Sequence, residues 1–250
     1  MYAGLDSASF PGMHAMNWLK ANTNLTWTGY YLAPWGAGKE FKPKWRAALP
    51  RLRETGWGIA PIYLGKQPNT LAATLKQRGK LGKERFDGYD DGVEAARFAK
   101  SAEFGPASVL YFDLEKYEFT KAWKQYLYGW MEGVMDAGYY PGLYCSHLRA
   151  DELSNDADVT GYPFMPHPRI WAVSPAGRFG ETLRDPATKG PVTNYHVNPG
   201  KYSVATTATS WQYRHNCFLL YVDETNPKKP KTLPWKVDIN ASIYADPGKW

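Results

Sequence analysis

The chain has few cysteines and no long apolar run. Cys145 and Cys217 are the only two cysteines in 250 residues, so no disulfide framework holds the fold and its stability must come from core burial. The sequence leaves open a single disulfide between these two cysteines.

No stretch of eighteen or more apolar residues occurs, and no basic segment precedes an apolar one at the amino terminus, which excludes a membrane span and an export signal of the usual kind. We expect a soluble chain, and three routes to its site of action stay open. The protein acts where it is made, a signal has been removed from it, or a lysis pore or secretion machine delivers it.

Metal-ligand patterns are also sparse. The segment Cys145-Ser-His147 lacks a second Cys/His pair at zinc spacing, so we predict no metal site and no cofactor. The five histidines all fall in predicted helices or loops rather than at strand ends, and we interpret them as surface or structural residues. They are His14, His147, His167, His196 and His215.

Positive charge and aromatic residues are abundant. The formal net charge is +6 and the isoelectric point is near 9.1, which favours anionic partners such as cell-wall polymers, nucleic acid or acidic lipid without choosing among them. No nucleic-acid motif accompanies the charge, so we expect no specific nucleic-acid partner. The basic run Lys228-Lys-Pro-Lys231 is interpreted as a solvated surface loop.

Eleven Trp and 18 Tyr exceed what a core of this size needs, and amphipathic rings in excess suit a sugar-stacking cleft.

Short β-rich segments alternate with helical patterns along the whole chain, as expected for a parallel sheet with helices packed outside it. The predicted strands are 2–6, 27–32, 58–64, 108–115, 140–145, 170–174, 209–213 and 236–240. Eight strands close a (β/α)8 barrel of the TIM type, so we predict one α/β barrel domain over residues 1–250, irregular in its last third. The clearest helix follows Thr120, which can cap it, and ends near Gly138. Its apolar stripe, with Trp123 and Trp130, is interpreted as core.

Two carboxylates, Asp113 and Glu115, stand two residues apart at the end of the fourth predicted strand. Side chains alternate across a strand, so both leave the backbone on the same face. In a parallel barrel the carboxyl ends of the strands converge on the face that carries active sites, and there Asp6 ends the first strand and Asp238 the eighth. Four carboxylates would then meet at one mouth. Taken alone, Asp113 and Glu115 also fit an ion-paired loop acid followed by a helix cap.

Aromatic and amide side chains near the same strand ends suit a sugar-binding cleft, because rings stack on sugars and amides hydrogen-bond to hydroxyls. Asn240 shares the face of Asp238 on the last predicted strand. The candidate substrate-binding residues are Tyr63, Tyr144, Trp171, Trp211, Gln212, Tyr213 and Asn240.

The strand motifs resemble, in order, those of glycoside hydrolase family 25 lysozymes. They are Gly4-Leu-Asp-Ser-Ala-Ser9, Tyr111-Phe-Asp-Leu-Glu115, Pro141-Gly-Leu-Tyr-Cys-Ser146, Ile170-Trp-Ala172, Trp211-Gln-Tyr213 and Val237-Asp-Ile-Asn240. The chain is more similar still to their relatives, the glycoside-hydrolase-like bacterial domain of unknown function family 1906. The small residues before the acidic strand resemble a helix of that domain. They are Gly88, Gly92, Ala95, Ala96, Ala99 and Gly105-Pro106. The resemblance covers nearly the whole chain.

The resemblance implies a muramidase-like glycosidase that cuts peptidoglycan or a related cell-wall polysaccharide, outside the cell or at the wall, and we expect a monomer. By position, Glu115 corresponds to the general acid and Asp113 to the partner that stabilises or attacks the oxocarbenium ion, while Asp6 and Asp238 support them. Crowding carboxylates in a partly dry cleft fits these roles, because one acid can hold its proton near neutral pH while another stays ionised. Strand six continues as Ser174-Pro-Ala where the lysozymes usually have an aromatic residue, which leaves the substrate open.

Two other interpretations stay open beside the glycosidase. One is a catalytically inactive barrel that binds a cell-wall glycan in the same cleft. The other is a metal-dependent phosphodiesterase, since clusters of Asp, Glu and Asn at a barrel mouth also hold magnesium or calcium.

Overall fold

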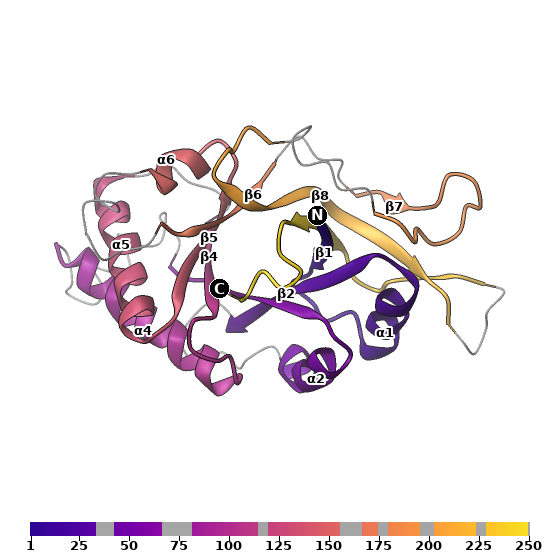
Figure 1. Cartoon of the computed structure of the whole chain (residues 1–250), viewed down its shortest axis with the longest axis horizontal. Coiled ribbons are helices and arrows are strands. Elements are labelled where there is room, and N and C mark those ends of the chain that lie inside the picture. The colour runs from indigo at the N-terminus through magenta and orange to yellow at the C-terminus, as the bar shows by residue number, and fades with distance from the viewer. Residues whose placement is uncertain are drawn as a thin grey trace.

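A closed barrel of eight strands forms the centre of the molecule (Figure 1). The computed structural model describes residues 1–33, 43–66, 82–114, 120–155, 167–174, 180–195, 203–223 and 229–249. Around the barrel the strands follow the order β1 (Tyr2–Asp6), β2 (Leu25–Ala33), β3 (Gly58–Tyr63), β4 (Val109–Leu114), β5 (Tyr140–Ser146), β6 (Arg169–Val173), β8 (Ala208–Tyr221) and β10 (Val237–Ser242). Pairing of β10 with both β8 and β1 closes the ring. The predicted eight-stranded barrel of the TIM type is therefore confirmed.

The last strand runs against the predicted direction. From β1 to β6, and from β6 to β8, neighbouring strands are parallel, whereas β10 is antiparallel to both of its neighbours. The prediction of a fully parallel barrel is thus wrong for β10. The reason lies in β8, which is 14 residues long instead of the predicted five and extends past the barrel. The short β9 (Lys231–Thr232) folds back on its far end, so the chain re-enters the barrel from that end.

Five helices lie outside the barrel in the described part of the chain. They are α1 (Met13–Asn22), α2 (Pro43–Glu54), α4 (Glu84–Ser101), α5 (Lys121–Asp136) and α6 (Ala150–Ser154). Figure 1 shows α4, α5 and α6 on one side of the barrel, and the arm of β7 (Thr182–Leu183) with the end of β8 on the other. Thr120 caps α5 as predicted, because its hydroxyl accepts a hydrogen bond of 3.2 Å from the Trp123 amide. None of these five helices is long and apolar enough to cross a bilayer.

The helices α4 and α5 pack closely enough to touch along their backbones. A Cβ atom on Gly88 of α4 would lie 1.9 Å from the carbonyl oxygen of Tyr126, and one on Gly129 of α5 would lie 1.9 Å from that of Arg85. Each helix therefore needs glycine where the other crosses it. Trp123 and Trp130, interpreted from the sequence as core, are buried between this helix pair and the barrel.

The barrel interior is filled with aromatic side chains below the mouth. Trp171 of β6 lies at the centre, and its ring meets Trp27, Tyr111 and Tyr144 edge-on at centroid distances of 5.1, 5.6 and 4.9 Å. The segment from residue 244 to 249 covers the opposite end, where the Pro247 carbonyl accepts hydrogen bonds from the Tyr111 hydroxyl and the Arg169 guanidinium. Cys145 and Cys217 are both buried and free, so no bridge joins them.

Candidate active site at the barrel mouth

Asp6 and Asp238 face each other at the mouth of the barrel. Asp6 is the last residue of β1 and pairs in register with Asp238, the second residue of β10. Side chains that oppose each other in an antiparallel pair have Cβ atoms about 5 Å apart. The sequence pattern predicts Asp238 near the carboxyl end of a parallel strand. Instead it lies at the start of β10, and the antiparallel direction of that strand is what brings it to the mouth.

The Asp6 carboxylate lies at the end of a buried hydrogen-bond chain. The Asn240 amide donates to it at 2.8 Å, and the indole N–H of Trp171 donates to the Asn240 carbonyl oxygen at 3.1 Å. Gly29 of β2 leaves the room that this arrangement needs, because a Cβ there would lie 2.6 Å from the Cβ of Asp6. Asp6 is only 3% exposed. Both donors in the chain are neutral, so they orient the carboxylate without adding a positive charge.

A β-bulge in β8 holds Asp238. Asn216 has a φ of 53°, and its backbone N–H donates to the Asp238 carboxylate at 2.5 Å. The register between β10 and β8 shifts between Val237 and Ile239, which is where a bulge inserts its extra residue. Asparagine tolerates this left-handed conformation better than most residues. Asp238 is half-buried, and thus more accessible than Asp6.

Asp113 lies at the same end of the barrel as Asp6. It alternates with Val109 and Tyr111, which face the interior of the barrel, and it is buried. Because β1 and β4 are parallel and separated by β2 and β3 in the ring, Asp113 approaches the mouth from the far side of the barrel relative to Asp6. Glu115 lies outside the described residues, so its position stays a prediction from strand alternation.

A pocket of about 570 Å³ opens over Asp6 and Asp238. Its wall includes Ser7, Tyr31, Asn216, Phe218, Trp235 and Lys236, none of which was singled out from the sequence. Tyr31 could have been found, because it alternates with Gly29 and Trp27 on the inner face of β2. Trp235 precedes the strand predicted over 236–240, and Lys236 is the first residue of that predicted strand, whereas β10 begins at Val237. Among the described residues, no group of three or more His, Cys, Asp or Glu side chains is placed to hold a metal ion.

The remaining predicted site residues divide between two faces of the barrel wall. Tyr144, Trp171, Gln212 and Asn240 are buried inside the barrel, where the Tyr144 hydroxyl donates to the Gln212 side-chain oxygen.

By contrast, the structure does not bring Tyr63, Trp211 and Tyr213 to the pocket, because strand alternation directs them outward. Tyr63 donates to Glu94 of α4 at 3.1 Å, and Trp211 and Tyr213 pack in the core outside the barrel.

His215 corrects the prediction that all histidines fall in helices or loops. It lies within β8 and is buried, with Nδ1 2.7 Å from the Gln212 amide nitrogen and Nε2 2.6 Å from the Ser174 carbonyl oxygen. The prediction failed because β8 continues eight residues past its expected end. His215 and Tyr144 together fix the orientation of Gln212 inside the barrel.

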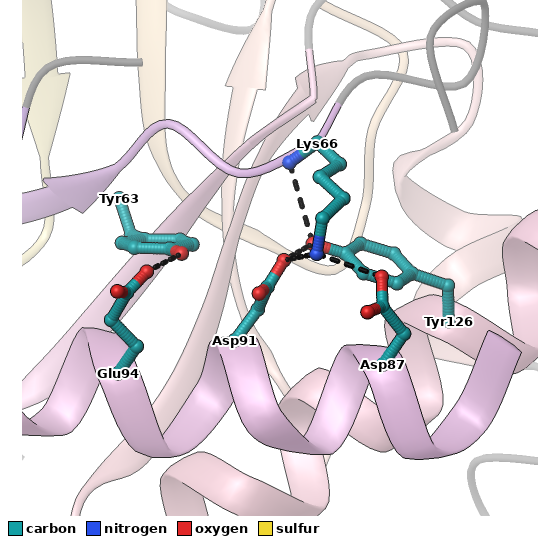
Figure 2. A network of polar contacts seen from close by, with 6 residues as sticks. All are labelled: Tyr63, Lys66, Asp87, Asp91, Glu94 and Tyr126. Carbon is teal, nitrogen blue, oxygen red and sulfur yellow. Dashed lines mark hydrogen bonds and ion pairs between the residues drawn. The ribbon is translucent and has the colours of Figure 1, made fainter. Parts of the chain in front are cut away.

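A second cluster of carboxylates lies outside the barrel wall, between the end of β3 and the helices α4 and α5 (Figure 2). Figure 2 shows Asp87 and Asp91 of α4 pointing toward the Lys66 ammonium, which is 2.7 Å from Asp87 and also ion-paired with Asp91. The Tyr126 hydroxyl donates to Asp91 at 2.6 Å. Burial, with the nearby Asp91 charge, raises the pKa of Tyr126 well above its usual value.

Comparisons with known proteins bear on the family and the fold of the chain. The model of the Rv2525c-like, glycoside hydrolase-like domain matches residues 17–217. The comparison with curated proteins gives no match.

Several solved structures share the fold, among them the following three. The Tat-secreted protein Rv2525c of Mycobacterium tuberculosis, in complex with L-tartrate, is 16% identical over 100% of this chain and 98% of its own, with a TM-score of 0.58. An uncharacterized protein of B. stearothermophilus is 20% identical over 97% of this chain and 96% of its own, with a TM-score of 0.56. A family 25 glycosyl hydrolase from Bacillus anthracis is 17% identical over 98% of this chain and 89% of its own, with a TM-score of 0.52.

Proposed function

Because the chain belongs to the Rv2525c-like family of glycoside hydrolase-like domains, we propose that it hydrolyses the glycan of peptidoglycan or a related cell-wall polymer at the barrel mouth. The observation that carries the proposal is the register pair of Asp6 and Asp238 beneath an open pocket. Carboxylates crowded at one cleft are what cleavage of a glycosidic bond requires, because one acid must give a proton and another must stabilise positive charge.

In the proposed reaction, the carboxyl group of Glu115 protonates the glycosidic oxygen as the bond from that oxygen to the anomeric carbon breaks. Asp113 stabilises or attacks the oxocarbenium-like carbon. Water then adds to this carbon, and its proton returns to a carboxylate. Strand alternation predicts that Asp113 and Glu115 leave the backbone on the same face, which would let both act on the same bond.

Asp6 and Asp238 contribute negative charge at the other side of the mouth. Their donors described above are the Asn240 amide and the Asn216 backbone N–H. These neutral groups fix the carboxylates in place before the substrate arrives, and a preorganised negative charge stabilises a positive charge that develops in the transition state.

We further propose that the protein acts on the cell wall outside the cytoplasm. The mycobacterial protein with the same fold is Tat-secreted, and peptidoglycan is an extracytoplasmic polymer. The proposed substrate and the proposed location therefore fit each other.

Release of reducing ends from purified peptidoglycan tests the proposal. We expect the wild-type protein to release them, and we expect Glu115→Gln and Asp113→Asn each to lower the rate by at least about 100-fold, as for loss of an acid or base, with glycan binding retained. Glu54→Gln, an exposed acid on α2, is the matched control and should turn over normally. Wild-type protein that binds the glycan but releases nothing at any pH would instead identify a glycan-binding barrel.

A further inference from the structure

An exposed tryptophan stands at the rim of the pocket. Trp235 is 47% exposed and lines the pocket together with Asp6 and Asp238. In contrast, Trp27, Trp45, Trp123, Trp130 and Trp171 are fully buried. The Trp235 ring is therefore open to a ligand in the pocket, and an amphipathic ring of this kind can stack on a sugar.

The backbone on both sides of Trp235 is fixed. Leu233 is buried, and its N–H donates to the Leu219 carbonyl at 2.8 Å. On the other side, the Lys236 carbonyl accepts a hydrogen bond of 2.9 Å from the Ser7 hydroxyl. The Trp235 ring is therefore presented from a short segment that is tied to β8 and to the end of β1, which lowers the entropic cost of stacking a sugar on it.

Lys236 adds a positive charge to the same wall. Its ammonium lies 5.7 Å from the centroid of the Phe218 ring, which also lines the pocket. Within the described ranges, no carboxylate lies at ion-pair distance from it, whereas Lys231 nearby is paired with Asp223. The pocket thus has two carboxylates at its floor and one ammonium at its rim.

We infer that Trp235 and Lys236 recognise a sugar residue that carries a free carboxylate, next to the sugar that lies over Asp6 and Asp238. Trp235 stacks on the pyranose ring, and Lys236 pairs with its carboxylate. A single negative charge fits best, because the two acids at the floor would repel a larger one. This inference rests on the proposed function and narrows its substrate to an acidic glycan, in which the charged group also sets the direction of the chain across the mouth.

The inference is tested by measuring the affinity of the protein for two matched oligosaccharides by calorimetry. One is a chitin tetrasaccharide, and the other is the same tetrasaccharide with one carboxylate on each disaccharide. We expect the wild-type protein to prefer the acidic ligand by about fivefold, the upper range for an exposed ion pair, and to lose this preference in high salt. Lys236→Gln should remove the preference and leave the affinity for the neutral ligand unchanged. Trp235→Ala should lower the affinity for both ligands by about tenfold. Trp235→Phe should retain most of the wild-type affinity.

Two controls carry the same changes away from the pocket. Lys44→Gln on α2 removes one exposed positive charge, and Phe86→Ala on α4 removes one exposed ring; neither should alter binding. Equal affinity of the wild type for the two ligands, or an equal loss for both in Lys236→Gln, would overturn the inference while the proposed function stands. Wild-type protein that binds neither these ligands nor peptidoglycan would overturn both.

Discussion

Two acidic clusters of this molecule use the same residue type in opposite ways. At the mouth, Asp6 and Asp238 accept hydrogen bonds from an amide side chain and a backbone N–H and border a pocket of about 570 Å³. Between β3 and α4, Asp87 and Asp91 close around the ammonium of Lys66. The ammonium of Lys66 offsets part of the charge of these two carboxylates and ties the end of β3 to α4. The two donors at the mouth are neutral, so they orient the carboxylates without adding a positive charge.

Removing the cation from the second cluster should have the largest effect on stability. Lys66→Met leaves Asp87 and Asp91 without this cation in a buried place, so we expect a loss of about 3 to 5 kcal/mol in the free energy of unfolding. Denaturant titration measures it. The matched control is Arg51→Ala, which breaks the exposed pair with Glu54 and should cost less than about 0.5 kcal/mol. An equal, small change in both variants would show that the cluster does not hold β3 to α4.

The close contact of α4 and α5 supports the second cluster and can be tested separately. Gly129→Ala places a methyl group against the carbonyl of Arg85, so we expect a loss of about 2 to 3 kcal/mol from overpacking. Gly105→Ala is the control, because a Cβ there meets no atom within 4 Å. Gly129→Ala with the stability of the wild type would mean that the two helices can separate without cost.

The sequence allowed most of the barrel to be predicted, because each strand has its own apolar run. The position of Asp6 at the end of β1 followed directly from this pattern. The direction of β10 could not be predicted, since it depends on how far β8 extends and on the return through β9, and strand alternation carries no sign of direction. Alternation could have excluded Tyr63, which has the opposite parity to Ile62 and Ala60 on the inner face. Trp235 could not have been found, because its exposure depends on tertiary contacts of its neighbours.

Breaking the hydrogen-bond chain at the mouth should affect stability less than function. Asn240→Ala removes the donor to Asp6 and the acceptor of the buried Trp171 N–H, so we expect a loss of about 1 to 2 kcal/mol in stability. Peptidoglycan turnover should fall by at least about tenfold, because a misplaced carboxylate loses its preorganisation. Rates normalised to folded protein separate the two effects. Unchanged turnover would mean that Asp6 needs no support from Asn240.

The thiols of the barrel wall should stay unreactive through all changes at the mouth. Burial raises the pKa of both Cys145 and Cys217 to about 12, so almost no thiolate is present below pH 9. We expect no reaction with a thiol reagent at pH 8 in the wild type or in Asn240→Ala, and reaction of two thiols per chain in denaturant. Rapid labelling of the folded Asn240→Ala variant would show that this substitution opens the wall as well as the mouth.

The most direct measurement is the rate of reducing-end release from peptidoglycan by Asp6→Asn and Asp91→Asn, compared with the wild type. We predict that Asp6→Asn lowers the rate by at least about 100-fold with little change in stability. Asp91→Asn should lower stability and leave the rate per folded molecule intact. Wild-type turnover by Asp6→Asn would contradict the assignment of the mouth carboxylates to the chemistry.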